Sequence, residues 1–355
     1  MAPRFMPGPN HEYIAGGSGQ GITTAANAAA FARWAVYPRL LRDVTAGHAR
    51  VSLPGCALSR PLLLAPLALQ TLAHPQGELE TARAAEAAGS CMIASTLSSF
   101  SLETIAPLAG PVKWFQLYLQ PQRETTLDLV RRAEAAGYGA IVLTLDAAIQ
   151  VAGLRALRAG FRMPADVLPA NLKDYPQPAR QLLDAGASRI FQGAMREAPT
   201  LDDVDWLLSQ TRLPVWIKGV MHSDDARALK ARGAAGLVVS NHGGRGLDGA
   251  PASLDVLAAV RAAVGPAYPL LFDGGIRSGS DVFKALALGA DAVLIGRLQV
   301  YALAVAGAPG VAHMLRLLGE ELEVCMALAG CATLADIDRS ALLRIPEGGA
   351  DADHH

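Results

Sequence analysis

Residues 236–248, Gly-Leu-Val-Val-Ser-Asn-His-Gly-Gly-Arg-Gly-Leu-Asp, join a short apolar run to a cluster of polar and glycine residues. The apolar run is typical of a buried strand, and the polar cluster marks the end of that strand. His242 and Arg245 are therefore expected to leave the sheet together at one edge. A base that titrates near neutral pH, three residues from a permanent cation, suits proton removal from an anionic substrate.

Apolar runs of this kind recur along the chain at fairly regular intervals. Because the runs are continuous rather than alternating, they indicate strands buried on both faces, as in a parallel sheet covered by helices. Amphipathic helical patterns lie between most of them, and each pattern is followed by a glycine suited to a helix C-terminus. The predicted strands are 62–68, 91–95, 112–118, 140–146, 214–219, 235–241, 269–274 and 291–296, and the predicted helices are 78–88, 123–136, 223–232, 253–264 and 279–288.

Eight strand–helix units in 355 residues favour an α/β protein with a closed (β/α)8 barrel, the TIM barrel. An open Rossmann-type sheet is the alternative, but no Gly-x-Gly-x-x-Gly follows the first strand. We therefore expect a short N-terminal extension over 1–60, the barrel over 61–340 and a C-terminal tail over 341–355. The extension is expected to cover the barrel bottom or to contribute to the mouth of the site.

One interval breaks this rhythm, because residues 147–213 separate the fourth and fifth strands by about twice the usual spacing. This long loop after strand 4 leaves the barrel on its catalytic rim, where such loops are commonly active-site lids or disordered insertions. The segment 305–335 is expected to form the last helices.

Composition excludes several classes of partner. Hydrophobic residues make up 51% of the chain, and 31 basic residues balance 32 acidic ones, which gives no reason to expect nucleic acid or anionic lipid as a partner. The four cysteines lack CxxC spacing, which favours a reducing compartment and argues against a metal site. No signal-peptide core and no uncharged apolar run of spanning length is present, so we expect a cytoplasmic protein without a membrane span.

Polar residues gather where the predicted strands end, which in TIM barrels is the functional face. Any single strand end is polar simply because it meets water, but a set containing Lys, Tyr, His, two Asp and three Arg indicates a site. Asp-Gly-Gly-Ile-Arg-Ser-Gly at 273–279 leads into a helix, and Ile-Gly-Arg at 295–297 follows the eighth strand. Glycine N–H groups, a helix N-terminus and two arginines make a phosphate cradle, so we expect a cofactor with a terminal monophosphate, such as FMN.

These residues resemble the FMN-dependent α-hydroxy acid oxidases and dehydrogenases, a family that includes glycolate oxidase, lactate oxidase and mandelate dehydrogenase. The resemblance extends from about Tyr13 to Ile337, and Ser-Asn-His-Gly-Gly-Arg-Gly-Leu-Asp at 240–248 is its most specific element. Ala-Pro-Leu-Ala-Leu-Gln at 65–70, Trp-Phe-Gln-Leu-Tyr at 114–118 and Ile-Lys-Gly at 217–219 are also similar.

The resemblance implies a role for each site residue. His242 abstracts a proton from the substrate, Asp146 orients its imidazole and stabilises the imidazolium, and Tyr118 takes part in catalysis. Arg245 pairs with the substrate carboxylate, and Tyr118 and Tyr13 hydrogen-bond the substrate. The implied FMN ligands are the backbone at Pro66, Leu67 and Ala68, the side chains of Ser95, Gln116, Thr144 and Ser240, Lys218 beside flavin N1 and O2, Asp273 at the ribityl chain, and Gly275, Arg277, Gly296 and Arg297 at the phosphate.

The match fails at one place. The family usually carries a second carboxylate-binding arginine shortly after the aspartate of the fourth strand, within Gly-x-Arg. Without gaps, Gly153 occupies the position of that arginine; with two residues inserted, Gly153-Leu154-Arg155 restores the motif. Both alignments stay open from the sequence. Leu67 and Leu97 make the pocket apolar, which favours longer aliphatic or aromatic hydroxy acids over glycolate.

The resemblance implies FMN-dependent oxidation of an (S)-2-hydroxy acid to the 2-oxo acid, with FMN reoxidised by oxygen or by another acceptor. Proton removal from C2 and hydride transfer coupled to O–H deprotonation are both compatible with the sequence. The altered segment at 147–155 motivates an alternative, in which the enzyme oxidises a lactone, a modified peptide or another carboxylate-poor alcohol. A flavin-binding protein without turnover is a third hypothesis, against which His242, Asp146 and Lys218 argue. The family also implies a homotetramer or homo-octamer.

Overall fold

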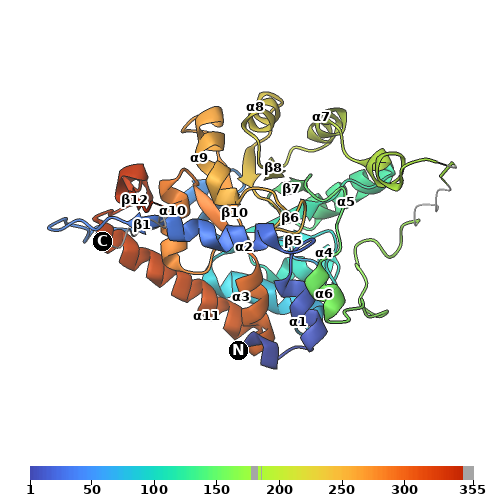
Figure 1. Ribbon diagram of the computed structural model, residues 1–355, viewed down its shortest axis with the longest axis horizontal. Coiled ribbons are helices and arrows are strands. Elements are labelled where there is room, and N and C mark those ends of the chain that lie inside the picture. Colours follow the sequence, from blue (N-terminus) through green and yellow to red (C-terminus); the bar gives the residue numbers. More distant parts are fainter. Residues whose placement is uncertain (177–182, 185, 347–355) are drawn as a thin grey trace, which may run out of the picture.

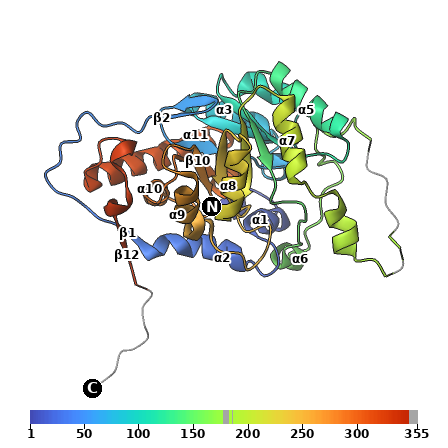
Figure 2. The ribbon, with the colours of Figure 1, turned by 90° about the horizontal axis from the view of Figure 1, so that it is seen from above.

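The computed structural model describes residues 1–176, 183, 184 and 186–346 of the chain. Eight parallel strands close into a barrel surrounded by helices (Figures 1 and 2). Each strand pairs with the next one along the chain, and the last pairs with the first, so the predicted (β/α)8 barrel of the α/β class is confirmed. Seven lie within the predicted ranges and β8 extends one residue beyond its range: β4 (Leu62–Leu64), β5 (Cys91–Ser95), β6 (Lys113–Leu117), β7 (Ile141–Thr144), β8 (Val215–Val220), β9 (Gly236–Val239), β10 (Leu270–Asp273) and β11 (Ala292–Ile295).

The predicted helices are present, with ends within one residue of the prediction. They are α3 (Gly77–Ala88), α5 (Arg123–Ala135), α8 (Ser223–Ala231), α9 (Ser253–Val264) and α10 (Gly279–Ala287). Their glycine stops are used as expected at Gly89, whose left-handed conformation ends α3. The 3-10 helices are short: Ala2–Arg4, Ala30–Arg33, Gln70–Leu72, Ala106–Leu108, Ala194–Glu197, Leu334–Asp336 and Arg339–Ala341.

The last helix differs from the expectation, because α11 (Arg297–Ala329) begins directly after β11 rather than at residue 305. Glycine and arginine at 296–297 serve both as the strand end and as the helix start. Non-helical φ and ψ angles at Ala306 and Gly307 kink α11, and the freed N–H of Ala308 donates to Glu80 Oε2 at 2.8 Å. Length and composition alone would let this helix cross a membrane, but it packs along α3 and α10 as the last barrel helix.

Side chains alternate along each strand between the barrel interior and the surrounding helices. One interior layer is wholly apolar, and at its centre the rings of Trp114 and Trp216 stack with centroids 5.1 Å apart. This layer consists of Leu63, Ile93, Trp114, Val142, Trp216, Val238, Leu271 and Leu294. Two residues further along the strands, the next interior positions are Ala65, Ser95, Gln116, Thr144, Lys218, Ser240, Asp273 and Gly296. Strand periodicity therefore gathers predicted site residues into a ring above the apolar layer.

The N-terminal extension contacts both ends of the barrel. Strands β2 (Val51–Leu53) and β3 (Cys56–Leu58) form a hairpin that covers the barrel bottom, where the indole N–H groups of Trp114 and Trp216 donate to the carbonyls of Gly55 and Pro54. Helices α1 (Gly8–Ala15) and α2 (Ile22–Ala29) precede it and lie at the site end of the barrel.

The start of the predicted C-terminal tail belongs to the fold. Strand β12 (Leu342–Arg344) pairs antiparallel with β1 (Trp34–Val36) of the extension. The rest of the predicted tail, from residue 347 onward, lies outside the described residues.

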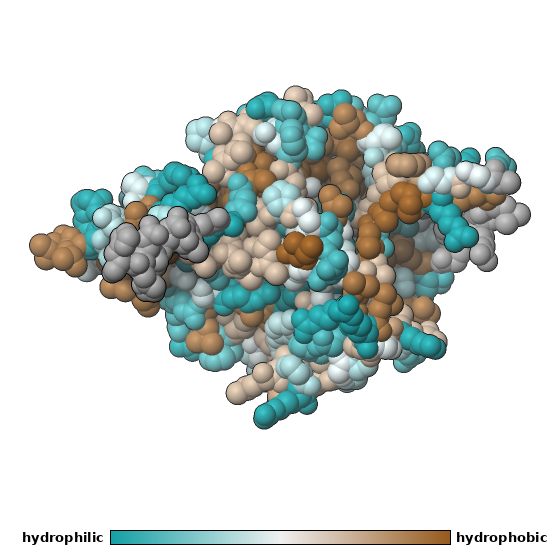
Figure 3. All heavy atoms as spheres, viewed as in Figure 1, coloured by the Kyte–Doolittle hydropathy of each residue, from teal (hydrophilic) through white to brown (hydrophobic). Residues whose placement is uncertain are grey.

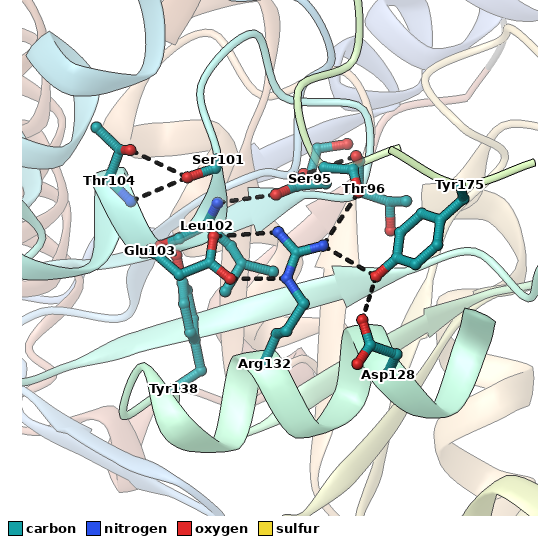
Figure 4. A network of polar contacts seen from close by, with 11 residues as sticks. Ser95, Thr96, Ser101, Leu102, Glu103, Thr104, Asp128, Arg132, Tyr138 and Tyr175 are labelled. Atoms are coloured by element: carbon teal, nitrogen blue, oxygen red, sulfur yellow. Dashed lines mark hydrogen bonds and ion pairs between the residues drawn. The ribbon is translucent and has the colours of Figure 1, made fainter. Parts of the chain in front are cut away.

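The long connection after β7, predicted as a loop over 147–213, contains three helical segments. They are α6 (Leu154–Arg158), a π-helix (Arg189–Gly193) and α7 (Leu201–Gln210). Asn171 anchors the connection, because its side-chain amide donates to the carbonyls of Ser95 and Thr96 and its Oδ1 accepts from Leu102 N–H at 2.8 Å. Figure 4 shows Arg132 of α5 between Glu103 and Tyr175, and Arg132 also donates to the Asn171 carbonyl. The connection is thereby fixed to the turn after β5.

The buried tryptophan pair gives a stability prediction. We expect Trp114→Ala to lower the free energy of unfolding by about 3–5 kcal/mol, because a large ring leaves the closed interior layer. Arg131→Ala, at an exposed position on α5, should change that energy by less than about 0.5 kcal/mol. Urea denaturation followed by circular dichroism measures both, and equal effects of the two variants would contradict the interior packing described here.

Candidate active site

The polar ring opens into a cavity of about 340 Å³, a size typical of small-molecule sites. Most predicted site residues line it: Tyr13, Pro66, Leu67, Ala68, Ser95, Tyr118, Lys218, His242, Arg245, Asp273, Gly275, Arg277, Gly296 and Arg297. The other four lie behind these. Asp146 bonds to His242, Gln116 to Ser95 and Ser240 to Lys218, while Thr144 pairs with Lys218 in the strand register.

Lys218 lies at the centre of a buried charged cluster. Its Nζ donates to Ser240 Oγ at 2.9 Å and lies 3.4 Å from Asp273 Oδ2 and 3.7 Å from Asp146 Oδ2. Burial alone would lower the pKa of Lys218, but the carboxylates of Asp146 and Asp273 outweigh it and raise that pKa. The ammonium therefore stays charged inside the barrel mouth.

His242 is held by a carboxylate on the neighbouring side of the ring. Its Nδ1 lies 2.7 Å from Asp146 Oδ1. His242 itself lines the cavity. Burial by itself would raise the pKa of Asp146, but the Lys218 ammonium and the His242 hydrogen bond lower it to about 2. Ionised Asp146 thus accepts Nδ1–H, which leaves Nε2 of the neutral ring unprotonated and able to act as a base.

The backbone at His242 is in an uncommon conformation. Its φ angle is +58°, and Gly243 and Gly244 continue the left-handed turn. Non-glycine residues adopt this conformation at a cost, and such residues cluster at functional sites. The turn is fixed by the His242 N–H, which donates to Ser240 Oγ at 3.0 Å, and by Gly244, where an added Cβ would approach Thr24 N to 2.6 Å.

Arg245, Tyr13 and Tyr118 line the cavity together with His242. The Arg245 guanidinium carbon lies 4.7 Å from the Tyr13 ring centroid, and its Nη1 donates to the Tyr13 and Gly16 carbonyls. The Tyr13 ring stacks on Phe161 of the long connection, with centroids 4.2 Å apart. Burial raises the pKa of Tyr118 to about 12, so its hydroxyl remains a hydrogen-bond donor at neutral pH.

Positive charge gathers around Arg297, whose Nη2 shares the Gly16 carbonyl with Arg245 and whose Nη1 donates to the Gly243 carbonyl; Arg277 lines the same cavity. Burial, together with Arg245 and Arg277 nearby, lowers the pKa of Arg297 to about 10, because neighbouring cations disfavour its charged form. An added Cβ at Gly296 would meet no atom within 4 Å, so open space adjoins this backbone. Gly275 differs, since an added Cβ there would lie 2.3 Å from the Asn27 carbonyl; this glycine is required by the packing of the extension.

The N-terminus of α10 contributes less to anion binding than the sequence indicates. Asp281 Oδ2 already accepts from the N–H groups of Arg277 and Ser278, and Glu321 accepts from that of Gly279. The arginines and the glycine backbone of the two loops are therefore the main anion-binding groups in this region.

Two buried polar atoms indicate that a polar ligand belongs in the cavity. Within the described residues, Gln116 Nε2 and Thr144 Oγ1 are buried without a hydrogen-bond partner. Such atoms are costly unless a ligand or water satisfies them. A planar ring with hydrogen-bonding edges fits Gln116, Thr144 and Lys218, and a phosphate fits Arg277 and Arg297, so the residues present fit FMN.

Part of the 240–248 segment is structural. Asn241 and Asn27 of α2 exchange two side-chain hydrogen bonds of 2.8 Å, and Asp248 accepts from the N–H groups of Gln20, Gly21 and Thr23. The same turn that carries His242 therefore fixes the extension over the cavity.

The two alignments left open by the sequence are both unproductive in the structure. Gly153 forms a parallel bridge with Gly19, and Arg155 forms an ion pair with Glu12 outside the cavity lining. Sequence reasoning missed Gln150, Met163 and Ile14 in the lining, because nothing in the sequence shows which residues of a long loop or an extension return to a barrel mouth.

Comparisons with known proteins agree with this geometry. The family described as FMN-dependent dehydrogenase matches residues 2–344. The chain is 68% identical over 342 residues to an L-lactate oxidase of Alicycliphilus denitrificans, covering 96% of this chain and 94% of the relative. It is 46% identical over 328 residues to a 4-hydroxymandelate oxidase of Amycolatopsis orientalis, covering 92% and 91%. A solved structure of mandelate oxidase with benzoyl-formic acid superimposes with a TM-score of 0.86 at 43% identity, covering 96% of this chain and 95% of that one.

The contact between the extension and the 240–248 turn can be tested directly. We expect Asp248→Ala to speed amide hydrogen exchange over residues 18–27 by about tenfold, because three N–H groups lose their acceptor. Asp225→Ala, on the exposed face of α8, is the matched control and should leave that segment unchanged. Unaltered exchange in the Asp248 variant would show that other contacts fix the extension.

Proposed function

Because this chain belongs to the FMN-dependent dehydrogenase family, we propose that FMN lies in the cavity and that the 18 residues named from the sequence carry the reaction. The enzyme oxidises an (S)-2-hydroxy acid to the 2-oxo acid, with FMN as its cofactor and oxygen as the acceptor. When bound, FMN supplies the acceptor for the two electrons that leave the substrate. The observation that carries the proposal is the pair formed by His242 and ionised Asp146, next to Arg245.

His242 is proposed as the base. Its Nε2 is free to take a proton because Asp146 holds Nδ1–H, and the carboxylate stabilises the imidazolium that results. The proton comes from C2, or from the hydroxyl with the C2 hydrogen leaving as hydride. Either route needs the substrate hydroxyl carbon beside His242.

Arg245 is proposed to bind the substrate carboxylate. Its Nη1 faces main-chain carbonyls, whereas Nε and Nη2 have no partner within the described residues and can donate to a carboxylate. Tyr118 is proposed to donate to the substrate from its protonated hydroxyl, and Tyr13 to bind beside Arg245.

The remaining site residues are proposed to hold FMN. Gln116 Nε2, Thr144 Oγ1, Ser95, Ser240 and the backbone at 66–68 would meet the ring edge, with Lys218 placing positive charge beside it. Asp273 would bind the ribityl chain. Gly275, Gly296, Arg277 and Arg297 would bind the phosphate, since each Nη of Arg297 retains a second N–H besides those donated to carbonyls.

A small aliphatic acid such as (S)-lactate is the proposed substrate. The 68% identical relative is named as an L-lactate oxidase, and Leu67, Leu97 and Met163 give the lining an apolar part that suits a methyl group better than glycolate. An aromatic hydroxy acid is the second candidate, because the 46% identical relative is named as a 4-hydroxymandelate oxidase. A cytoplasmic location is proposed from the unpaired cysteines.

Anaerobic mixing tests the function. We expect (S)-lactate to bleach the absorbance of the oxidised flavin, and Asp146→Asn to slow this step by about a hundredfold or more at unchanged FMN content, because the neutral amide no longer stabilises the imidazolium. Asp128→Asn, on α5 away from the cavity, is the control and should reduce at the wild-type rate.

Two outcomes would contradict the proposal. A flavin that stays oxidised with lactate and with (S)-mandelate argues against the substrate class. Bleaching by a lactone or a simple alcohol alone would favour the carboxylate-poor alternative.

We also propose a homotetramer or homo-octamer. Figure 3 shows hydrophobic atoms at the surface, including a group at the far left of the view. Leu40 and Leu41, in the connection between β1 and β2, are 86% and 103% exposed. Val324 and Leu328 of α11 are exposed as well. Such residues are typical of surfaces covered by another subunit.

Light scattering after size-exclusion chromatography measures the assembly. We expect four or eight subunits for the wild type, and smaller species for the double variant Leu40→Asp with Leu41→Asp, because two charges would be buried at an interface. A monomeric wild type at micromolar concentration would overturn the proposed assembly.

A further inference from the structure

We propose that this enzyme recognises the carboxyl end of its substrate with one guanidinium, Arg245, and with the neutral amide of Gln150, and that it therefore also oxidises carboxamides of 2-hydroxy acids. The inference rests on the proposed function and narrows its substrate class. It depends on three observations. Position 153 has no room for a side chain, Arg155 forms an ion pair with Glu12, and the long connection supplies Gln150 to the cavity lining.

Position 153 cannot hold a side chain in this fold. Gly153 lies against the extension, where Leu154 N–H donates to the Gly19 carbonyl at 2.9 Å and Gly19 N–H donates to the Ala152 carbonyl at 3.2 Å. An added Cβ on Gly153 would lie 2.2 Å from the Gly17 carbonyl oxygen, well inside contact distance. The backbone of the extension thus occupies the space into which a side chain from 153 would extend.

Arg155 does not replace it. Its guanidinium binds both carboxylate oxygens of Glu12, and this hydrogen bond, with that of His11, lowers the pKa of Glu12 to about 2. Arg155 is not in the cavity lining; it lines a neighbouring surface groove with His11 and Tyr301, and this groove shares Arg277 and Arg297 with the cavity. The α1–α6 contact therefore uses this charge to fix the extension.

The other two arginines that line the cavity, Arg277 and Arg297, have different surroundings from Arg245. Arg297 donates from Nε, Nη1 and Nη2 to the carbonyls of Ile14, Gly243 and Gly16. Arg277 begins the turn into α10, at the proposed phosphate end. Within the described residues, Arg245 Nε and Nη2 make no hydrogen bond, whereas every guanidinium nitrogen of Arg297 donates to a main-chain carbonyl.

Gln150 is the polar side chain that the long connection brings to the cavity, together with apolar Met163. A primary amide both donates and accepts, so it can bind a carboxylate or a carboxamide, whereas a guanidinium only donates. Losing one charged pair costs about tenfold to a hundredfold in binding. The second-order rate of flavin reduction should therefore be about tenfold to a hundredfold higher for an acid than for its carboxamide. With two guanidinium groups at the carboxylate, the square of that factor would be expected.

The chemistry of the reacting centre is the same for both substrates. The carboxamide loses the C2 hydrogen and the hydroxyl hydrogen, as two electrons and two protons, and becomes the 2-oxo amide. FMN, when bound, would accept the two electrons, and oxygen as the final acceptor would take them up with two protons to give hydrogen peroxide. His242 takes one proton in either case, and the carboxamide group is not itself changed.

The test compares (S)-lactate with (S)-lactamide, and (S)-mandelate with (S)-mandelamide, by the second-order rate of flavin reduction under anaerobic conditions. We expect each acid to exceed its amide by about tenfold to a hundredfold. An amide slower than its acid by more than about ten-thousandfold would overturn the inference. Failure of both acids would instead overturn the proposed function, which keeps the two results distinguishable.

Variants at positions 150 and 155 distinguish the proposed role of Gln150 from that of Arg155. We expect Gln150→Arg to raise the acid-to-amide ratio at least tenfold, and Gln150→Glu to lower it by a similar factor through repulsion of the carboxylate. Arg155→Ala is the matched control and should leave the ratio unchanged, with FMN content confirming that each variant is folded. A ratio that falls in the Arg155 variant, or that ignores both changes at Gln150, would contradict the inference.

Discussion

The buried ammonium of Lys218 is the constraint around which the site is arranged. A cation inside the barrel mouth is tolerated only if carboxylates surround it. Asp146 does so from the turn after the neighbouring strand β7, and Asp273 from the end of β10, two strands away on the other side. Each carboxylate then has a second task. Asp146 is kept ionised by Lys218 and can orient His242, while Asp273 accepts from Ser240, whose hydroxyl also supports the His242 backbone. The groups that compensate the charge of Lys218 therefore also position His242.

The turn that carries His242 also has two tasks. A left-handed His242 followed by two glycines brings the ring over the cavity, and the end of that turn binds the extension through Asn241 and Asp248. The extension in return supplies Tyr13 to the cavity and carbonyl acceptors for Arg245. The mouth of the barrel is therefore closed by a segment remote in sequence, whose attachment cannot be separated from the geometry of the base.

Substrate recognition depends on how this extension meets the long connection. Where their backbones touch, at Gly17 and Gly153, neither residue leaves room for a side chain, and the nearby arginine is used to hold Glu12. Backbone packing between the extension and the long connection therefore keeps both Gly153 and Arg155 out of the cavity lining.

The sequence by itself determined the barrel and most of the candidate site. Continuous apolar runs located the eight strands, and because side chains alternate along a strand, Ser95, Gln116 and Lys218 had to face the interior one layer above the tryptophans. It did not place α7 or the start of α11, since helix signals there overlap a long loop and a strand end. Only the tertiary structure decided between Gly153 and Arg155, because that choice depends on contacts with residues more than 130 positions away, and local spacing carries no information about such contacts.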